Sequence, residues 1–242
     1  MQIIPRNELQ VWFASVRELG TETEEYFSCL SSTEQQRARH FRFDKDRMTY
    51  VLGKYMIRGL LARALFVRPQ QIEFVFNKYG KPTLSSDSGV SFNLAHAGEF
   101  VVCALAADRD IGVDIEAERT DIDFTGLASR YFCSAEIRNL EASSRTRRVP
   151  LFYKYWTLKE AYLKAEGSGL NLSLTEVDTS GVSDDCPGIP CAPVEGVPRG
   201  ILVQRLEVPL GYAAAVAATG GIWTVRARRW HMEEFPVERS VT

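Results

Sequence analysis

The pattern of hydrophobic and polar residues predicts short strands alternating with amphipathic helices. Hydrophobic positions at helical spacing fill residues 46–65, and a second long helix carries Glu160. A capping box, Ser31-Ser-Thr-Glu34, predicts the start of another helix. We expect further helices over residues 22–30, 124–131 and 135–141, and strands over residues 9–16, 72–76, 90–94, 100–106, 111–116, 201–207, 212–218 and 223–230.

The two halves of the chain share one pattern. A glycine followed by an apolar run occurs at residues 98–107 and again at residues 211–218, each time before another strand. This repeat predicts an α+β fold with pseudo-twofold duplicated halves, each made of helices packed on a small antiparallel sheet. We expect an N-terminal half at residues 1–109 and a C-terminal half at residues 110–242. Ligands favour clefts between subdomains, so a site is expected near this junction.

Composition narrows the class of protein. The 242 residues are 45% hydrophobic and 25% charged, with a net charge of -2, as in an ordinary soluble protein. The balanced charge and the lack of a basic stripe argue against nucleic acid as a partner. No apolar run reaches the ~20 residues that a membrane span needs, and the N-terminus lacks signal-peptide features. With five scattered cysteines, the expected location is the cytoplasm, with reduced thiols.

The segment Ile111-Gly-Val-Asp-Ile-Glu116 predicts a strand with two chemically different faces. Its three apolar residues share one face, and Gly112, Asp114 and Glu116 share the other. Carboxylates two positions apart on a strand lie ~6.6 Å apart along it, close enough to bind one hard cation. Gly112 is expected to leave room on that face for a ligand.

Glu160 belongs to the helix Phe152-Tyr-Lys-Tyr-Trp-Thr-Leu-Lys-Glu-Ala-Tyr-Leu-Lys164. Phe152, Trp156 and Glu160 are spaced four residues apart and therefore share one face of the helix. This face is an aromatic stripe, where an unpaired carboxylate would be costly. A bound metal ion or a cationic partner would remove that cost. The residues alone leave two interpretations: a Mg²⁺ site that handles phosphates, or ordinary charged strand and helix surfaces.

Three basic features lie elsewhere in the chain. The turn Asn77-Lys-Tyr-Gly-Lys-Pro82 presents Lys78 and Lys81, either to a phosphate or only to solvent. His96 follows a predicted strand, where it could meet an anion or serve as a structural hydrogen-bonding group. Arg37, Arg39 and Arg47 could bind phosphate or simply solvate helix surfaces.

The order of four segments strongly resembles the 4′-phosphopantetheinyl transferases. They are Tyr79-Gly-Lys-Pro82, Phe92-Asn-Leu-Ala-His96, Gly112-Val-Asp-Ile-Glu116 and Trp156-Thr-Leu-Lys-Glu-Ala161 with Lys164. The length and the duplicated halves are similar to the monomeric, surfactin-synthetase-activating (Sfp-type) branch. The resemblance implies transfer of the 4′-phosphopantetheine arm of coenzyme A to a serine of an apo acyl or peptidyl carrier protein, with release of 3′,5′-ADP. It also implies a monomer with a pseudo-dimeric fold.

The resemblance assigns roles to particular residues. Asp114, Glu116 and Glu160 would bind Mg²⁺, or Mn²⁺ in its place, and Asp114 would thereby help to hold coenzyme A. Lys159 and Lys164 would contact the coenzyme A phosphates and, with Glu160 as a candidate base, form the catalytic set. The residues expected to hold the nucleotide end are Arg47, Lys81 and His96, and Glu136 matches an acidic position near the active site.

The chain departs from the family at three positions. Ala95 and Ala97 replace the usual serines beside His96, and Glu34 stands where some members carry a basic residue. A missing hydroxyl at position 95 predicts weaker coenzyme A binding, which Ala95→Ser would restore. An alternative activity for the same residues is a Mg²⁺-dependent phosphotransferase or hydrolase that cleaves another nucleotide pyrophosphate. A non-catalytic binding module that kept the fold is a further alternative.

Overall fold

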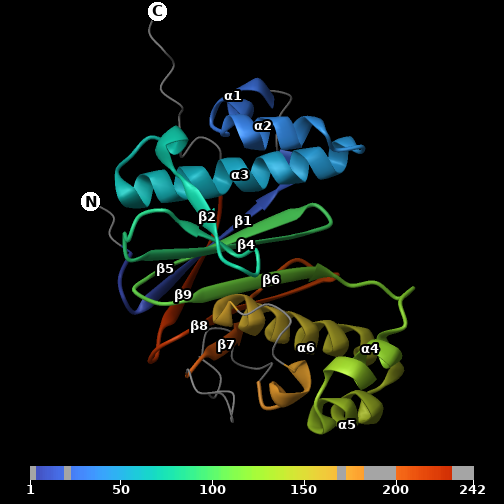
Figure 1. The fold of residues 1–242 in the computed structure, drawn as a ribbon. Helices are drawn as coiled ribbons and strands as arrows, with labels where there is room; N and C mark the ends of the chain where they lie inside the picture. The colour runs from blue at the N-terminus through green and yellow to red at the C-terminus, as the bar shows by residue number, and fades with distance from the viewer. Residues whose placement is uncertain (1–3, 19–22, 168–172, 183–199, 231–242) are drawn as a thin grey trace, which may run out of the picture.

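The computed structural model describes residues 4–18, 23–167, 173–182 and 200–230. The chain forms two stacked halves, each with a sheet covered on its outer side by one long helix (Figure 1). No helix among these residues is long and apolar enough to cross a membrane.

The first sheet has the strand order β4-β5-β1-β9. Its strands are β1 (Glu8–Ser15), β4 (Val90–Ala97), β5 (Phe100–Ala107) and β9 (Thr224–Arg229). The helix α3 (Asp44–Leu65) packs on this sheet, with α1 (Thr23–Ser28) and α2 (Ser32–Arg39) outside it (Figure 1). Residues such as Trp12, Leu52, Met56 and Phe92 fill the core between helix and sheet.

The second sheet is antiparallel, with the order β6-β8-β7. Its strands are β6 (Ile111–Ala117), β7 (Leu202–Arg205) and β8 (Tyr212–Ala218), and its long helix is α6 (Arg145–Glu166). The smaller helices α4 (Phe124–Tyr131) and α5 (Ser134–Ala142) lie beside α6 (Figure 1). Small side chains, Ala215 and Ala217, line the face of β8 toward α6, so the helix can approach closely.

The order of elements supports a duplicated α+β fold. In each half one strand (β1 or β6) precedes the helices, a 22-residue helix follows, and a hairpin completes the sheet. The last strand, β9, departs from the predicted division at residue 109, because it returns to the first sheet. It pairs in parallel with β1, so this sheet is not wholly antiparallel as expected.

The interface between the halves is mostly apolar. Leu9, Val102 and Ala104 from the first sheet meet Val113 and Val216 from the second in one buried cluster. A buried polar contact crosses it, since the side-chain carbonyl of Asn93 accepts a 2.9 Å hydrogen bond from the backbone N–H of Val113. Strands β4 and β6 are thereby held next to each other.

A small hairpin also joins the halves. It consists of β2 (Phe74–Phe76) and β3 (Pro82–Leu84). At its tip, the Asn77 amide donates 3.0 Å to the carbonyl of Gly167, and Lys81 Nζ donates 3.2 Å to Ile111 O and 3.3 Å to Ala165 O. The tip of a first-half hairpin therefore docks on the C-terminal end of α6.

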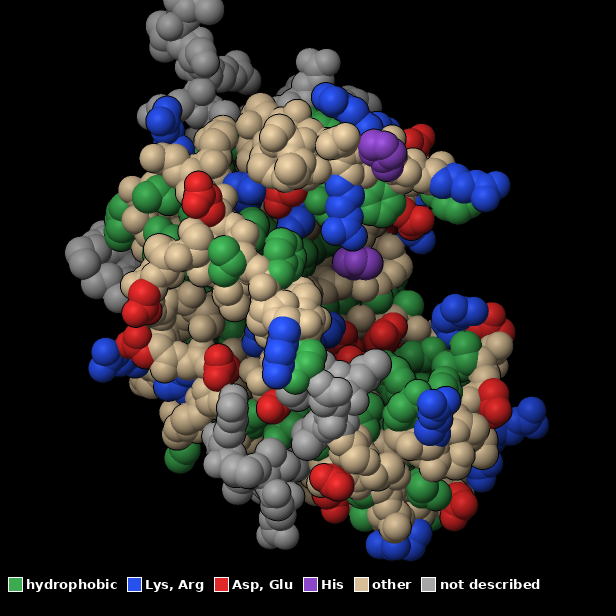
Figure 2. All heavy atoms as spheres, in the orientation of Figure 1, with side chains coloured by type: hydrophobic (Ala, Val, Ile, Leu, Met, Phe, Trp, Pro, Cys, Tyr) green, Lys and Arg blue, Asp and Glu red, His purple; other side chains and the backbone are tan. Residues whose placement is uncertain are grey.

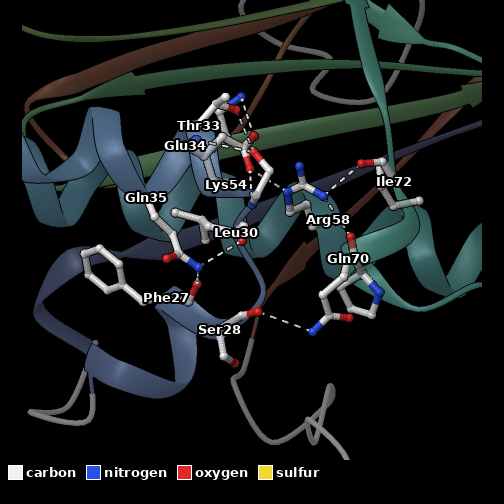
Figure 3. Close-up of polar contacts among 12 residues, drawn as sticks. Phe27, Ser28, Leu30, Thr33, Glu34, Gln35, Lys54, Arg58, Gln70 and Ile72 are labelled. Carbon is white, nitrogen blue, oxygen red and sulfur yellow. Dashed lines mark hydrogen bonds and ion pairs between the residues drawn. The ribbon is translucent and has the colours of Figure 1, made fainter.

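A buried ion-pair network fixes the base of this hairpin (Figure 3). The predicted capping box is confirmed, because Ser31 Oγ accepts from Glu34 N and the Glu34 carboxylate accepts from Ser31 N. Glu34 also receives Arg58 Nε at 2.7 Å, and Arg58 Nη1 donates 2.9 Å to Ile72 O, just before β2. Glu34 thus links α2 to α3 and, through Arg58, to the segment entering β2.

Candidate functional site

The site begins where β6 packs against α6. The alternation predicted for β6 is confirmed: Ile111, Val113 and Ile115 face the core between the halves. The reason expected for Gly112 is wrong, because the space above it holds the helix and not a ligand. A Cβ at position 112 would lie 2.1 Å from Ala161 O and 2.3 Å from Ala165 N. Gly112 therefore allows α6 to lie directly on the strand.

Asp114 and Lys164 meet across this contact. Lys164 Nζ donates to Asp114 Oδ1 at 2.6 Å, and Asp114 is only 4% exposed. The other carboxylate oxygen, Oδ2, is buried with no hydrogen-bond partner. Burial raises the pKa of Asp114, and the positive charge of Lys164 opposes this increase. Half of the carboxylate is thus left without the partner that a buried charge requires.

Glu116 and Glu160 extend the acidic cluster. Burial, followed by repulsion from Asp114, raises the pKa of Glu116 to about 7, although Lys164 and a hydrogen bond from Trp156 oppose the increase. Burial and then repulsion from Asp114 also raise the pKa of Glu160. The three carboxylates therefore repel one another at one end of the contact between β6 and α6.

This arrangement fits a hard divalent cation. Mg²⁺ prefers carboxylate oxygens, and a cation here would satisfy Asp114 Oδ2 and relieve the mutual repulsion. The oxygens of these three carboxylates do not all lie within 4.8 Å of one another. Among the residues described, the group of three potential ligands whose atoms all lie within 4.8 Å is a different one, Cys133, Glu136 and Asp178.

A pocket of about 250 Å³ adjoins the acidic cluster. Glu160 and Lys164 line one side, and Tyr79, Lys81 and Pro82 of the hairpin line the other. Asn93 also lines it, a residue that the sequence analysis did not single out. A polar side chain on the inward side of a strand was the signal that could have found it. The pocket therefore lies where the two halves meet, as the sequence predicted.

The other residues predicted to hold the nucleotide end, His96 and Arg47, lie in the first half. His96 is exposed at the end of β4, and partial burial, followed by the charge of Lys164, lowers its pKa while Asp46 opposes the shift. Arg47 pairs with Asp44 at 3.0 Å and its Nε lacks a partner. Figure 2 shows a hollow between the halves, with acidic side chains inside and histidine and basic side chains above.

Comparisons with known proteins identify the family of the chain. The 4′-phosphopantetheinyl transferase superfamily matches residues 110–194, and the family described as 4′-phosphopantetheinyl transferase, N-terminal, matches residues 16–108. The 4′-phosphopantetheinyl transferase HetI of Nostoc sp. is 32% identical over 228 residues, covering 93% of this chain and 92% of HetI. The chain belongs to the 4′-phosphopantetheinyl transferase superfamily.

A second relative gives the same result. The 4′-phosphopantetheinyl transferase Sfp of Bacillus subtilis is 29% identical over 204 residues, covering 81% of this chain and 85% of Sfp. The predicted family and the α+β class are confirmed, and the chain is an enzyme that transfers phosphopantetheine from coenzyme A to carrier proteins.

Lys159 of this transferase does not lie where the sequence predicted. Its side chain is fully buried, and Nζ lies 2.9 Å from Glu136 Oε2 and 2.7 Å from Leu174 O, with Val177 O as a third acceptor. Helical geometry turns Lys159 about 100° away from Glu160, toward α5. The structure thus turns Lys159 away from the pocket, whereas the sequence assigned it to the coenzyme A phosphates. Glu136 is likewise buried and faces this lysine.

The structure also places Ala95 in different surroundings from those that the sequence predicted. Strand β4 runs through Ala97 and does not end at Leu94, so Ala95 and His96 point to opposite faces. Ala95 is 5% exposed and belongs to the apolar cluster between the two sheets. A serine hydroxyl there would face that cluster and not the side on which His96 is exposed. Glu34, the third departure from the family, forms ion pairs with Arg58 and Lys54.

Proposed function

We propose that this transferase catalyses Mg²⁺-dependent transfer of the 4′-phosphopantetheine arm of coenzyme A to a serine of an apo acyl or peptidyl carrier protein. The serine oxygen forms a bond to the β-phosphorus, and the bond from that phosphorus to the departing 3′,5′-ADP breaks. The observation that carries the proposal is the cluster of Asp114, Glu116 and Glu160, with an unpartnered buried oxygen, beside a pocket between the halves.

The three carboxylates are the proposed metal ligands. A bound Mg²⁺ would neutralise charge on the pyrophosphate and stabilise the leaving group. Lys164 would then exchange its contact with Asp114 for a phosphate oxygen, acting as a positioned positive charge. Glu160 is the proposed acceptor of the serine proton, because it lines the pocket next to Lys164.

The proposed place of coenzyme A follows the same geometry. Lys81 lines the pocket, and His96 and Arg47 lie on the first-half side. We propose that these three residues hold the nucleotide end of coenzyme A. The carrier would dock on local basic and apolar surface, since the net charge of -2 provides no general attraction to an acidic protein. We further propose a monomer that acts in the cytoplasm.

The test is intact mass spectrometry of apo carrier proteins incubated with the transferase, coenzyme A and Mg²⁺. The expected result is a gain of one phosphopantetheine arm and an equal amount of 3′,5′-ADP, both lost when EDTA removes the metal. Asp114→Asn, Glu116→Gln and Glu160→Gln should each lower the rate by at least about 100-fold. Glu118→Gln is the matched control, because Glu118 follows β6, and burial raises its pKa while Arg205, and not the acidic cluster, opposes the shift.

Two outcomes would contradict the proposal. If 3′,5′-ADP were released without any carrier protein at the full rate, the protein would be a pyrophosphate hydrolase. If EDTA left the transfer rate unchanged, or if the three carboxylate variants turned over like Glu118→Gln, the metal assignment would fail.

A further inference from the structure

The environment of Lys159 accounts for its entire hydrogen-bonding capacity. An ammonium group has three N–H donors. In this chain Nζ meets three acceptors, Leu174 O, Val177 O and the carboxylate of Glu136. The side chain is 1% exposed and that of Glu136 is 0% exposed. No donor of Lys159 is left for a phosphate, and its surroundings exclude solvent.

Glu136 completes a closed polar network. Its Oε1 accepts from the backbone N–H of Thr179 at 2.9 Å and from the Thr179 hydroxyl at 2.6 Å. Its Oε2 accepts from Cys133 N at 2.9 Å, at the start of α5. Together, Lys159, Glu136 and Thr179 form what we call the α6 latch, which joins α6, α5 and the segment of residues 173–182.

The latch lies about 100° around α6 from Glu160. Lys159 directly precedes Glu160, and Lys164 follows one turn later on the same helix. The helix rests on β6 without any intervening side chain at Gly112, so contacts on its flanks help to fix its rotation. A helix that lost the latch could turn and move Glu160 and Lys164 relative to Asp114.

We infer that Lys159 is a positioning residue, which fixes the rotation of α6 through Glu136 and Thr179 so that Glu160 and Lys164 face Asp114. This inference rests on the proposed function, in which Glu160 and Lys164 handle the metal and the phosphate. It differs from a phosphate contact in one decisive way. A phosphate contact needs the lysine charge itself, whereas the latch needs packed side chains at positions 159 and 136 and no charge buried without its partner.

The experiment compares Lys159→Met, Glu136→Gln and the double variant. The single Lys159→Met variant buries the Glu136 charge alone, and we expect kcat to fall about 10–100-fold with a higher Mg²⁺ concentration at half-maximal rate. The KM for coenzyme A should rise less than in Lys164→Met, because the phosphate contact of Lys164 is displaced and not removed. The double variant should recover most of kcat. Lys159 as a phosphate ligand would instead give equal losses in the single and double variants, which would overturn the inference.

Two matched lysines of α6 serve as controls. Lys154 is also buried and binds the same segment, but through Val182 O, at 2.6 Å. We expect no rescue when Glu136→Gln is added to Lys154→Met, because Lys159 then keeps a buried charge without its carboxylate partner. Lys164→Met, which removes a proposed phosphate contact, should raise the KM for coenzyme A and should not be rescued by Glu136→Gln.

A structural readout separates the inference from the proposed function. Hydrogen–deuterium exchange of the Thr179 amide, measured without coenzyme A or carrier, should accelerate in Lys159→Met and less so in the double variant. Unchanged exchange together with a raised coenzyme A KM would overturn the latch, even if the variant folds normally. If the wild type transferred nothing to any carrier, the proposed function would fail while the exchange data would still test the latch.

Discussion

At the residue scale, β6 shows what alternation along a strand can predict and what it cannot. The pattern placed Asp114 and Glu116 on one face, and the structure confirms the two-faced strand. The pattern could not show that this face lies under α6, since that depends on a helix about 50 residues later. The pattern therefore predicts that Gly112 makes room for a ligand, whereas in the structure it allows the backbones of β6 and α6 to pack closely.

Gly112→Ala should destabilise the protein strongly. The new Cβ would lie 2.1 Å from a backbone oxygen of α6, which cannot move aside as a flexible side chain could. We expect a loss of about 3 kcal/mol or more in the free energy of unfolding, measured by urea titration. Gly221→Ala is the control, because a Cβ there meets nothing within 4 Å. Equal stability of the two variants would contradict the close packing of α6 on β6.

Ala95→Ser is predicted to act on stability and not on coenzyme A. The hydroxyl would enter the apolar cluster between the sheets, with an expected cost of about 1–3 kcal/mol in unfolding free energy. Titration calorimetry should give the same coenzyme A affinity for the variant and the wild type. Tighter binding of coenzyme A by the variant would instead support a hydrogen bond from position 95 to a phosphate.

Lys159 shows a second limit of the sequence at this scale. A lysine beside a proposed metal-binding glutamate is predicted to face phosphate, and only the placement of Glu136 and Thr179 shows that it is buried elsewhere. Both partners lie on other elements, so no local spacing indicates the burial of the ammonium group.

At the element scale, helices and strands with strong periodicity were predicted well. The bounds expected for α4 and β8 agree with the structure, because each has a clear pattern and a clear stop. The end of β4 was missed, since Ala95 and Gly98 suggested a turn where the strand continues to Ala97. Pairing with β5 along its whole length keeps it extended.

The β2–β3 hairpin should lose its docking on α6 when Lys81 is replaced. Lys81→Met removes the hydrogen bonds to Ile111 O and Ala165 O, and we expect faster hydrogen exchange at the hairpin and a several-fold higher KM for coenzyme A. Lys78→Met is the control on the same turn, because Lys78 is exposed and lies over the Tyr79 ring. Similar behaviour of the two variants would show that the hairpin tip does not depend on Lys81.

The Glu34 ion pairs that link α2 to α3 should make the free energy of unfolding depend on pH in the acidic range. Burial alone would raise the pKa of Glu34, but the hydrogen bonds from Arg58 and Ser31 and the charges of Arg58 and Lys54 lower it overall. A lowered carboxyl pKa stabilises the fold above the ordinary value of 4.5, and this contribution is lost as pH falls through the folded pKa. Glu34→Gln should therefore flatten the decline of unfolding free energy below that pH. A decline identical to that of the wild type would contradict this role.

At the scale of the whole molecule, the repeated pattern predicted two similar halves but not how they are joined. The echo between residues 98–107 and 211–218 corresponds to β5 and β8, each paired on both sides within its own sheet. The strands that follow them differ, because β6 opens the second half whereas β9 returns to the first sheet. Strands of similar pattern can occupy either place, so periodicity alone could not distinguish them.

The return of β9 predicts that the halves cannot be separated at residue 109. A fragment of residues 1–109 would lack β9 and Trp230, and it would expose the apolar face that the second sheet covers. We expect neither this fragment nor residues 110–242 to unfold cooperatively alone, by circular dichroism during urea titration. An equimolar mixture should regain a cooperative transition, because β9 can pair with β1 from the other fragment. A cooperative transition of residues 1–109 alone would instead support two independent domains with their boundary at residue 109.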